Sequence, residues 1–333
     1  MASQGSFRTR VRTNYGAFIM NAKPIRQQFA DTMLEVGKED EGLVVMVGDI
    51  SHFALQPFAK ACPGRYYNIG ICEPSMMSMA AGVSKSGLVP VVHTIAPFLL
   101  ERSYEQIKLD FCYHKLPGNI VTVGSAFDYA NLGCTHHCYG DFAMLKTLQN
   151  QEICYPSTAQ EFDLLFRQVY RSPKVTIYRI PSKSHSITWD PNKLDFGCGI
   201  NVVAGKDLTI IATGPQLENA MRARDILQSQ GWSPEVIYIH TIWPLDNELI
   251  YDSVSRTKNC IVIEEHMQSG GLGSEVLQVI HPIDGMRFHS LSIPNEFIHS
   301  YGGYEEQCKR LDLTAEGIVK RVNREFRNAS AAV

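Results

Sequence analysis

The sequence lacks any hydrophobic run long enough to cross a membrane. Its longest apolar stretch, residues 87–100, is interrupted by Pro90, His93 and Pro97, which makes it too short and too broken to span a bilayer. The first residues carry arginines, no acid before Asp31 and no apolar core of a secretory signal. We interpret residues 1–24 as a basic N-terminal arm, with a transit peptide as the alternative, and expect no membrane partner.

The sequence also lacks an excess of one charge and a disulfide framework. Lys and Arg number 31 against 34 Asp and Glu, a formal net charge of −3, so no basic field favours nucleic acid. The 9 cysteines are odd in number and scattered, which is typical of reduced thiols in a cytoplasmic protein. With 44% hydrophobic residues over 333 positions, the chain can bury a large core, and two domains are expected.

Common phosphate and metal motifs are missing. There is no P-loop and no Gly-x-Ser-x-Gly elbow, and the glycine-rich run at 269–276 lacks the last glycine of a dinucleotide fingerprint. Cys134, His136, His137 and Cys138 offer possible metal ligands within five residues. Four side chains so close in sequence rarely converge tetrahedrally on one metal ion. We therefore predict an active-site loop here and no metal ligands on this chain.

Short β-branched apolar runs alternate with segments of helical period. This alternation predicts an α/β fold with mostly parallel sheets flanked by helices. Strands are expected at 43–49, 89–95, 119–124, 174–180, 208–214, 235–241 and 259–266. Helices are expected at 74–85, 99–113, 141–148, 158–170, 216–229, 245–254 and from 273. The polar, Gly- and Pro-bearing segment 183–206 interrupts the pattern, so it is predicted to link a domain at 25–182 to one at 207–333.

Several short motifs, in a shared order, resemble the transketolase family of thiamine diphosphate enzymes. Those similar to its pyrimidine-binding domain are NIGICEPS from residue 68, PFLLERSYEQ from 97, GCTHH from 133 and YRIP from 178. Those similar to its C-terminal domain are DLTIIATG from 207, IHTIWPLD from 239 and EEHMQSGGLGSEV from 264. The resemblance implies a pyrimidine-binding fold followed by a transketolase C-terminal-like fold.

The family's diphosphate- and magnesium-binding motif, Gly-Asp-Gly, is absent from the sequence. The nearest match, Gly48-Asp49-Ile50, falls in the wrong domain. The resemblance therefore implies a β subunit that holds half of an active site. A separate α subunit would supply the diphosphate domain and the Mg²⁺ ligands, in an expected α2β2 heterotetramer.

The resemblance assigns cofactor roles to five residues. Glu73 is expected to be catalytic, because a carboxyl held against the aminopyrimidine nitrogen promotes the tautomer that activates the thiazolium carbon. Phe98 is expected to stack on the pyrimidine. Arg102 and Tyr104 are expected to line the cofactor pocket, and Asp49 to lie near the thiazolium ring. By residue type alone, Glu73 could be a helix-start acid and Phe98 a core residue.

The same resemblance assigns substrate contacts. His136 matches the histidine that faces the substrate carbonyl and hydroxyls, where it can donate to a developing alkoxide. Arg179 and Arg26 match arginines that hold a substrate phosphate. An acid that usually precedes Thr-His is replaced by Leu132, so the sugar-phosphate site is expected to be partly rebuilt.

We therefore predict a transferase that moves a two-carbon ketol unit from a ketose, phosphorylated or otherwise anionic, to an aldehyde. The alternative is the β subunit of a decarboxylating 2-oxo acid enzyme, either a dehydrogenase component or an acyloin- or deoxyxylulose-type synthase. A non-catalytic structural subunit is the third hypothesis. The ketose, the acceptor and the partner chain stay open.

Overall fold

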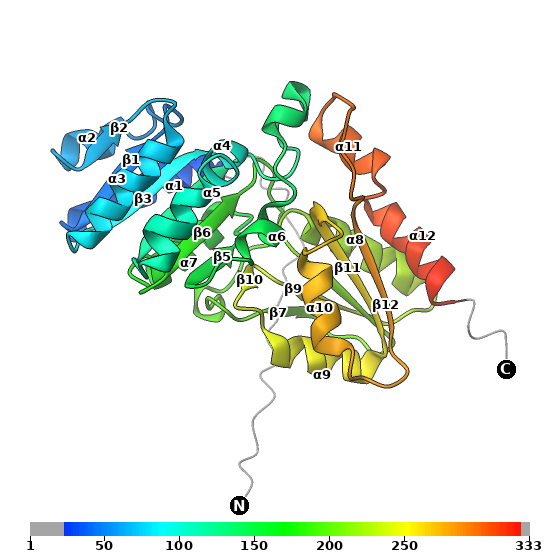
Figure 1. Ribbon diagram of the computed structural model, residues 1–333. Coiled ribbons are helices and arrows are strands. Elements are labelled where there is room, and N and C mark those ends of the chain that lie inside the picture. Colours follow the sequence, from blue (N-terminus) through cyan, green and yellow to red (C-terminus); the bar gives the residue numbers. More distant parts are fainter. Residues whose placement is uncertain (1–22, 328–333) are drawn as a thin grey trace, which may run out of the picture.

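The computed structural model describes residues 23–327, so nearly all of the arm expected at 1–24 lies outside the described residues. Two α/β units lie side by side, each built around a central sheet (Figure 1). This architecture confirms the predicted fold class, with mostly parallel strands flanked by helices.

The first unit contains a seven-stranded sheet in the order β10-β5-β6-β4-β3-β1-β2. Every neighbouring pair is parallel except β10–β5, and β10 comes from the second half of the chain. Nearly all residues of the inner strands are buried, as expected for a parallel sheet covered on both faces. The strands are β1 Leu43–Val47, β2 Tyr66–Asn68, β3 Val89–Ile95, β4 Gly118–Val123, β5 Gln151–Cys154, β6 Val175–Ile180 and β10 Thr241–Trp243.

Helices cover both faces of this sheet. One face carries α1 Ile25–Glu39, α2 Gln56–Ala61 and α7 Ala159–Val169. The other carries α3 Glu73–Lys85, α4 Ala96–Leu100, α5 Tyr104–Gln106, the π-helical η1 Ile107–Tyr113 and α6 Asp141–Leu145. The single helix predicted at 99–113 is therefore wrong. Ser103 leaves the helical region at φ −107°, ψ 18°, and its buried hydroxyl lies at the break between α4 and α5.

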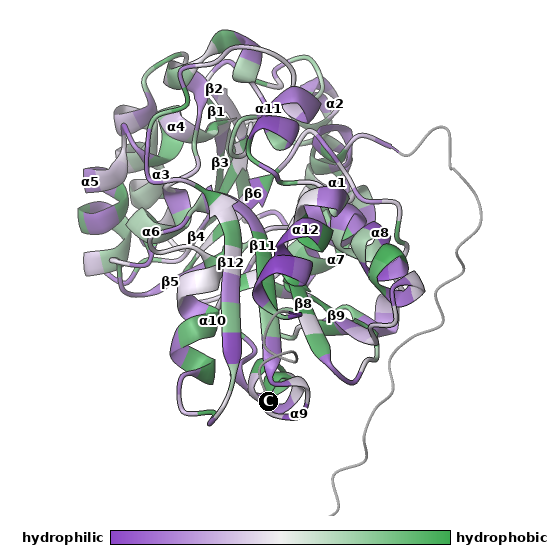
Figure 2. Ribbon diagram, turned by 90° about the vertical axis from the view of Figure 1, so that its right-hand side faces the viewer, coloured by the Kyte–Doolittle hydropathy of each residue, from purple (hydrophilic) through white to green (hydrophobic). Residues whose placement is uncertain are grey.

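The second unit contains a five-stranded sheet in the order β12-β11-β8-β9-β7, in which β7 alone is antiparallel to its neighbour. Its strands are β7 Ile200–Val203, β8 Leu208–Ala212, β9 Pro234–Tyr238, β11 Asn259–Met267 and β12 Arg287–Ile293. Its helices are α8 Gln216–Ser229, α9 Asn247–Thr257, α10 Leu272–Ile280, α11 Tyr304–Arg310 and α12 Ala315–Glu325. Figure 2 shows the hydrophobic strands β8 and β11 at the centre, beside more polar helices. Strand β7 lies inside the segment expected as a linker, so the second sheet begins before residue 206.

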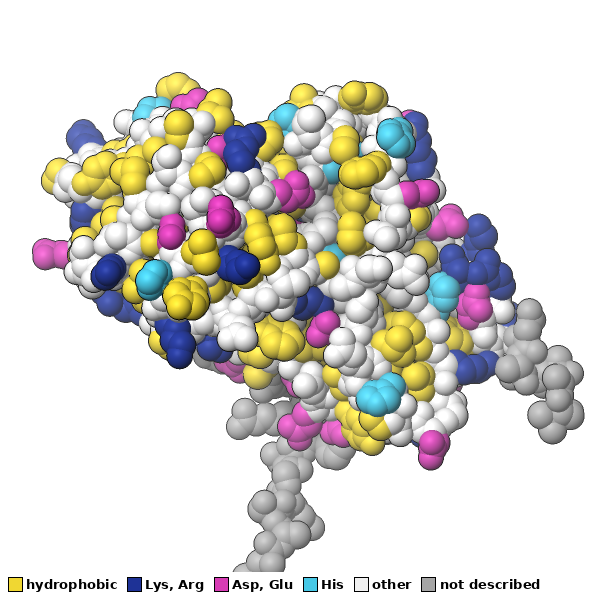
Figure 3. All heavy atoms as spheres, in the orientation of Figure 1, with side chains coloured by type: hydrophobic (Ala, Val, Ile, Leu, Met, Phe, Trp, Pro, Cys, Tyr) yellow, Lys and Arg dark blue, Asp and Glu magenta, His cyan; other side chains and the backbone are white. Residues whose placement is uncertain are grey.

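The drawn face of the molecule carries no single dominant charge. On the face drawn in Figure 3, basic and acidic side chains are interspersed among hydrophobic ones. Within residues 23–327 no helix is both long enough and apolar enough to cross a membrane.

Candidate active site

Glu73 is a buried carboxylate at the start of a helix. It opens α3 with only 1% of its side chain exposed, and its Oε2 lies 2.7 Å from Nη1 of Arg102. The ion pair thus joins a buried carboxylate to a guanidinium that is 44% exposed. Arg102 also lies over Phe98, with its guanidinium carbon 4.5 Å from the ring centroid. The guanidinium is thus shared between a carboxylate and an aromatic face.

Phe98 connects this pair to His136. The two rings meet edge to face, with centroids 5.1 Å apart. Nδ1 of His136 lies 2.9 Å from Oγ1 of Thr135, so the imidazole is oriented by its neighbour in the chain. Three segments far apart in the sequence, the start of α3, the middle of α4 and the turn Cys134–His136, therefore bring Glu73, Phe98 and His136 into one row, with Arg102 between the first two.

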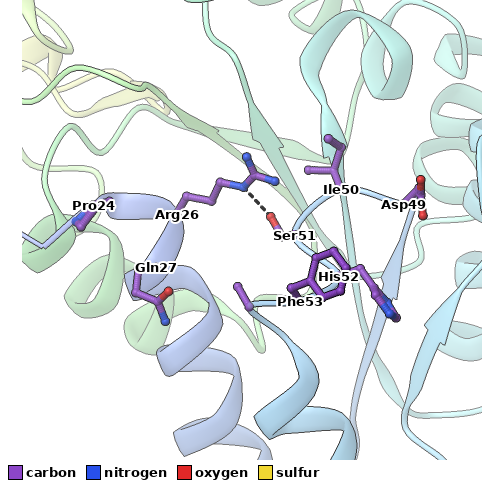
Figure 4. Close-up of a pocket in the computed structure, with 9 residues that line it drawn as sticks. Pro24, Arg26, Gln27, Asp49, Ile50, Ser51, His52 and Phe53 are labelled. Atoms are coloured by element: carbon purple, nitrogen blue, oxygen red, sulfur yellow. Dashed lines mark hydrogen bonds between the residues drawn. The ribbon is translucent and has the colours of Figure 1, made fainter.

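A cavity of about 450 Å³ lies at the start of α1. It is lined by Pro24, Arg26, Gln27 and residues 49–54. In Figure 4, Arg26 reaches from α1 toward Ser51, whereas Asp49 and His52 point away from it. Arg26 and Asp49 thus line one cavity, with the arginine as its cationic wall.

A buried hydrogen-bond relay holds Arg26 in place. Nε of Arg26 donates to Oγ of Ser51 at 2.6 Å, and that oxygen lies 2.8 Å from Nε2 of His93. Nδ1 of His93 lies 2.8 Å from the carbonyl of Val121, which can only accept, so Nδ1 carries the proton. Burial lowers the pKa of His93 to about 3, and Arg26 adds to that shift, so the imidazole is neutral. Sequence reasoning missed this role for His93, whose one signal is a polar residue within an apolar strand.

Asn68 joins the loop after β1 to the loop before α3. Its Oδ1 accepts from the backbone N–H groups of Asp49 and Gly70, and its Nδ2 donates to Oδ1 of Asp49, each at 3.1 Å. Asp49 and Ser51 have positive φ values of 64° and 60°. Such backbone strain is costly for residues other than glycine and is concentrated at functional sites. Sequence reasoning gave Asn68 no role.

Tyr104 is not part of the Glu73 cluster. Its hydroxyl lies 2.5 Å from Oγ1 of Thr147, just after α6. The prediction that it lines the same pocket as Arg102 is therefore not supported. The break at Ser103 between α4 and α5 lies directly between Arg102 and Tyr104.

Arg179, which is predicted to bind a substrate phosphate, is buried at the junction between the two units. Arg179 is 1% exposed, with Nε 2.9 Å from Oδ2 of Asp141, and its Nη2 donates to the carbonyls of Cys138 and Glu265. Its guanidinium also lies 4.5 and 4.6 Å from two aromatic rings. Burial raises the pKa of Asp141, and Arg179 opposes that shift. The second unit covers this strand end, so Arg179 belongs to the junction between the units.

The run of soft ligands around His136 does not form a cluster. Across residues 23–327 no group of three or more His, Cys, Asp and Glu side chains is arranged to hold a metal ion. Cys134 is exposed, whereas Cys138 is buried beneath the loop. These two thiols therefore lie in different environments.

Comparison with known families accounts for nearly all of the described chain. The model of the transketolase pyrimidine-binding domain matches residues 21–185, and that of the transketolase C-terminal domain matches residues 199–318. These ranges correspond to the two α/β units.

Curated relatives of similar length carry transketolase names. The chain is 30% identical over 311 residues to a protein named as a transketolase C-terminal section in Methanocaldococcus jannaschii, covering 92% of this chain and 97% of that one. It is also 30% identical over 298 residues to one of the subunits of the apulose-4-phosphate transketolase of Phocaeicola vulgatus, covering 89% and 95%. Against 1-deoxy-D-xylulose-5-phosphate synthase of Halothermothrix orenii, identity is 30% over 300 residues, but only 46% of that longer protein is covered.

Solved structures give the same fold. A split-gene transketolase, described as an inactive β4 tetramer, superposes with a TM-score of 0.82 at 26% identity, covering 92% of this chain and 99% of that one. A transketolase variant from Pichia stipitis matches with a TM-score of 0.74 at 17% identity, over 46% of its length, which supports the fold alone. This chain therefore belongs to the transketolase family, of which it carries the pyrimidine-binding and C-terminal domains.

Proposed function

We propose that this chain is the β subunit of a two-subunit, thiamine diphosphate-dependent transketolase. The observation that carries the proposal is the buried Glu73 carboxylate in a row with Phe98 and His136. The relatives of matching length support it, because one of them is named as a single subunit of a transketolase. The reaction would transfer a two-carbon ketol unit from an anionic ketose to an aldehyde.

The residues present fit the aminopyrimidine of thiamine diphosphate. When bound, this cofactor supplies a thiazolium carbon nucleophile that attacks the ketose carbonyl. Glu73 would hold a proton at the pyrimidine ring nitrogen, since a desolvated carboxyl suits that exchange. Phe98 is half-buried and offers a flat face for the ring. Arg102 presently contacts both groups, so it must move aside.

His136 and Arg26 would bind the substrate. Thr135 engages Nδ1 of the imidazole, which leaves Nε2 to donate to a substrate oxygen. Arg26, held by Ser51 at the wall of the 450 Å³ cavity, would bind the anionic end of the ketose. Asp49, at the far side of the same loop, would lie toward the thiazolium ring.

A partner chain would complete the site. Large hydrophobic side chains are exposed before α3, on α3 and at the end of η1, with Ile71 71%, Met79 48% and Tyr113 77% exposed. Large exposed apolar side chains on the adjoining elements α3 and η1 favour a protein interface. We propose that a diphosphate-binding α subunit, carrying the Mg²⁺ ligands, covers this region in an α2β2 assembly.

The test is Glu73→Gln in the complex reconstituted with the candidate α chain. Loss of the exchangeable carboxyl proton should lower kcat by about 10²–10⁴-fold. The control is Glu105→Gln, an exposed carboxylate on α5. Full activity of Glu73→Gln would overturn the catalytic role of Glu73. Tight thiamine diphosphate binding by this chain alone would overturn the proposal that a partner chain completes the site.

The deoxyxylulose-synthase relatives keep a decarboxylating reaction as the second candidate. They are as identical to this chain as the named transketolase subunit, and Leu132 replaces an acid that reads sugar hydroxyls in the family. Release of carbon dioxide from pyruvate by the complex, without ketose turnover, would favour that reaction.

A further inference from the structure

The loop that carries His136 is closed at its base. The N–H of Cys138 donates to the carbonyl of Ala126 at 2.7 Å, and the two residues form an isolated β-bridge. Oδ2 of Asp128 accepts from the N–H groups of Ser125 and Ser182, at 2.9 and 2.8 Å, which ties the first part of the loop to the end of β6. Residues 126–138, here named the His136 loop, therefore form a compact Ω-loop.

The second unit forms hydrogen bonds with Tyr139, the residue that follows this loop. Tyr139 is 7% exposed, and its hydroxyl donates to the carbonyl of Glu296 and accepts from the N–H of Ile298, both at 3.3 Å. Its carbonyl accepts from the N–H of Met267 at 2.8 Å. Both Glu296 and Ile298 lie in segment 296–301, between β12 and α11. The end of the His136 loop is thus fixed to the second unit, not only to its own sheet.

The same segment also contacts the tip of the loop. The ring of Tyr301 lies against Gly133, where an added Cβ would come within 2.8 Å of Cε1 of the tyrosine. Gly133 has a φ of 79° and directly precedes the turn Cys134–His136. The carbonyl of Tyr301 accepts from Nη1 of Arg310 at 3.0 Å, so the segment is anchored to α11. Figure 1 shows the loop between β4 and α6 beside the orange segment that leads into α11.

We propose that the C-terminal unit positions the active-site histidine, through Tyr139 at the base of the His136 loop and Tyr301 at its tip. Both are positioning residues, because their contacts run through the loop. The proposal rests on the role given to His136 above. It extends that role to the C-terminal unit, in which the resemblance assigns no site residue. A displacement of about 1 Å at a catalytic group can cost about 100-fold in rate.

The kinetic test uses the reconstituted complex and five variants, one of them a double variant. Tyr301→Ala should lower kcat about 10- to 100-fold, with the Kd of thiamine diphosphate unchanged. Tyr301→Phe should restore activity, because the ring and not the hydroxyl meets Gly133. Phe297→Ala is the matched control, an aromatic residue 70% exposed in the same segment. In the His136→Ala background, Tyr301→Ala should cause no further decrease in kcat, because Tyr301 acts only through the histidine.

A second readout needs no activity. Hydrogen exchange of residues 130–137 in the full chain should become several-fold faster in Tyr139→Phe and in Tyr301→Ala, and stay unchanged in Phe297→Ala. Unchanged exchange and unchanged kcat in Tyr301→Ala would overturn the positioning role, as would a full additional loss in the His136→Ala background. If the parent complex turns over no ketose while exchange still responds, the proposed reaction fails and the positioning of the loop stands.

Discussion

At the scale of single residues, Arg102 makes both contacts that the aminopyrimidine is expected to make. Its guanidinium is flat and cationic, pairs with the buried Glu73 carboxylate at 2.7 Å and lies on the face of Phe98. Its side chain is 44% exposed, so it can swing into water at modest cost. In the proposed site, Arg102 would therefore compete with the coenzyme for the same two groups.

We expect Arg102→Gln to bind thiamine diphosphate more tightly in the reconstituted complex. Breaking a partly exposed ion pair costs up to about 1 kcal/mol, which corresponds to a gain of about two- to fivefold in affinity. Calorimetric titration measures the Kd, with Arg171→Gln as the control, since that arginine pairs with Asp40 instead. Weaker binding by Arg102→Gln at unchanged thermal stability would make Arg102 a ligand of the coenzyme instead of its competitor.

At the scale of elements, the loop after β1 sets the cationic wall of the cavity. Ser51 accepts from Arg26 on α1 and donates to His93 on β3, so one hydroxyl connects two elements that flank the loop. Because Ser51 is 8% exposed and His93 is fully buried, water does not replace the bond to the imidazole when the hydroxyl is lost.

Ser51→Ala should therefore weaken binding of anionic substrates. The loss of a hydrogen bond to a charged group costs about 1.5–3 kcal/mol, so KM for a sugar phosphate should rise about tenfold or more. KM for an uncharged ketose and kcat should change little. Steady-state kinetics on both substrates, beside Ser86→Ala as a serine remote from the cavity, measure the effect. Equal changes for the charged and uncharged substrates would show that Ser51 only supports the fold.

The elements that the sequence predicts best are those whose burial is continuous. The apolar runs at 43–49, 89–95 and 259–266 become β1, β3 and β11, because strands covered on both faces need a hydrophobic residue at nearly every position. Short edge strands such as β2, β7 and β10 were missed. They pair on one side only and have three or four residues each, which is too short to show a clear periodicity.

The site could be predicted where a motif fixes local geometry. Glu73, Phe98 and His136 each lie in a short motif, and the structure brings them together. The burial of Arg179 could not be predicted, because a motif at a strand end does not reveal what covers it. Tyr301 was missed because its contact with Gly133 joins residues far apart in the chain.

At the scale of the whole molecule, the two units are held together by a buried carboxylate on α7. Oε1 of Glu161 accepts from Nε2 of His185 at 2.7 Å and from Nε1 of Trp189 at 2.5 Å, both in the connecting segment. Oε2 accepts from the N–H of Ser157 at 2.6 Å and from the hydroxyl of Tyr238 on β9 at 2.9 Å. One side chain thus ties the first unit, the connecting segment and the second sheet.

This arrangement predicts that the free energy of unfolding depends on pH. Burial by itself raises the pKa of Glu161, but the charge and hydrogen bond of His185, with the other donors, outweigh burial and lower the pKa to about 2. An ordinary glutamate titrates near 4.5, so the folded state favours the ionised form. The stabilisation is fully present above pH 4.5 and is lost as the pH falls through 2.

Glu161→Gln should therefore lower the free energy of unfolding by roughly 3 kcal/mol at pH 7, given about 1.36 kcal/mol for each unit of pKa shift. The difference in the free energy of unfolding between parent and variant should decrease by about 1 kcal/mol at pH 4. At that pH Glu161 begins to bind a proton in the unfolded parent, whereas it stays ionised in the folded parent. Urea unfolding at pH 7, 5.5 and 4 measures both values.

The control is Glu218→Gln, a carboxylate that holds the same connecting segment from outside through Ser186. Because Glu218 is less buried, its loss should cost less than about 1 kcal/mol at every pH. A gap for Glu161→Gln that stayed constant from pH 7 to pH 4 would show that packing, and not the charge of this carboxylate, joins the two units.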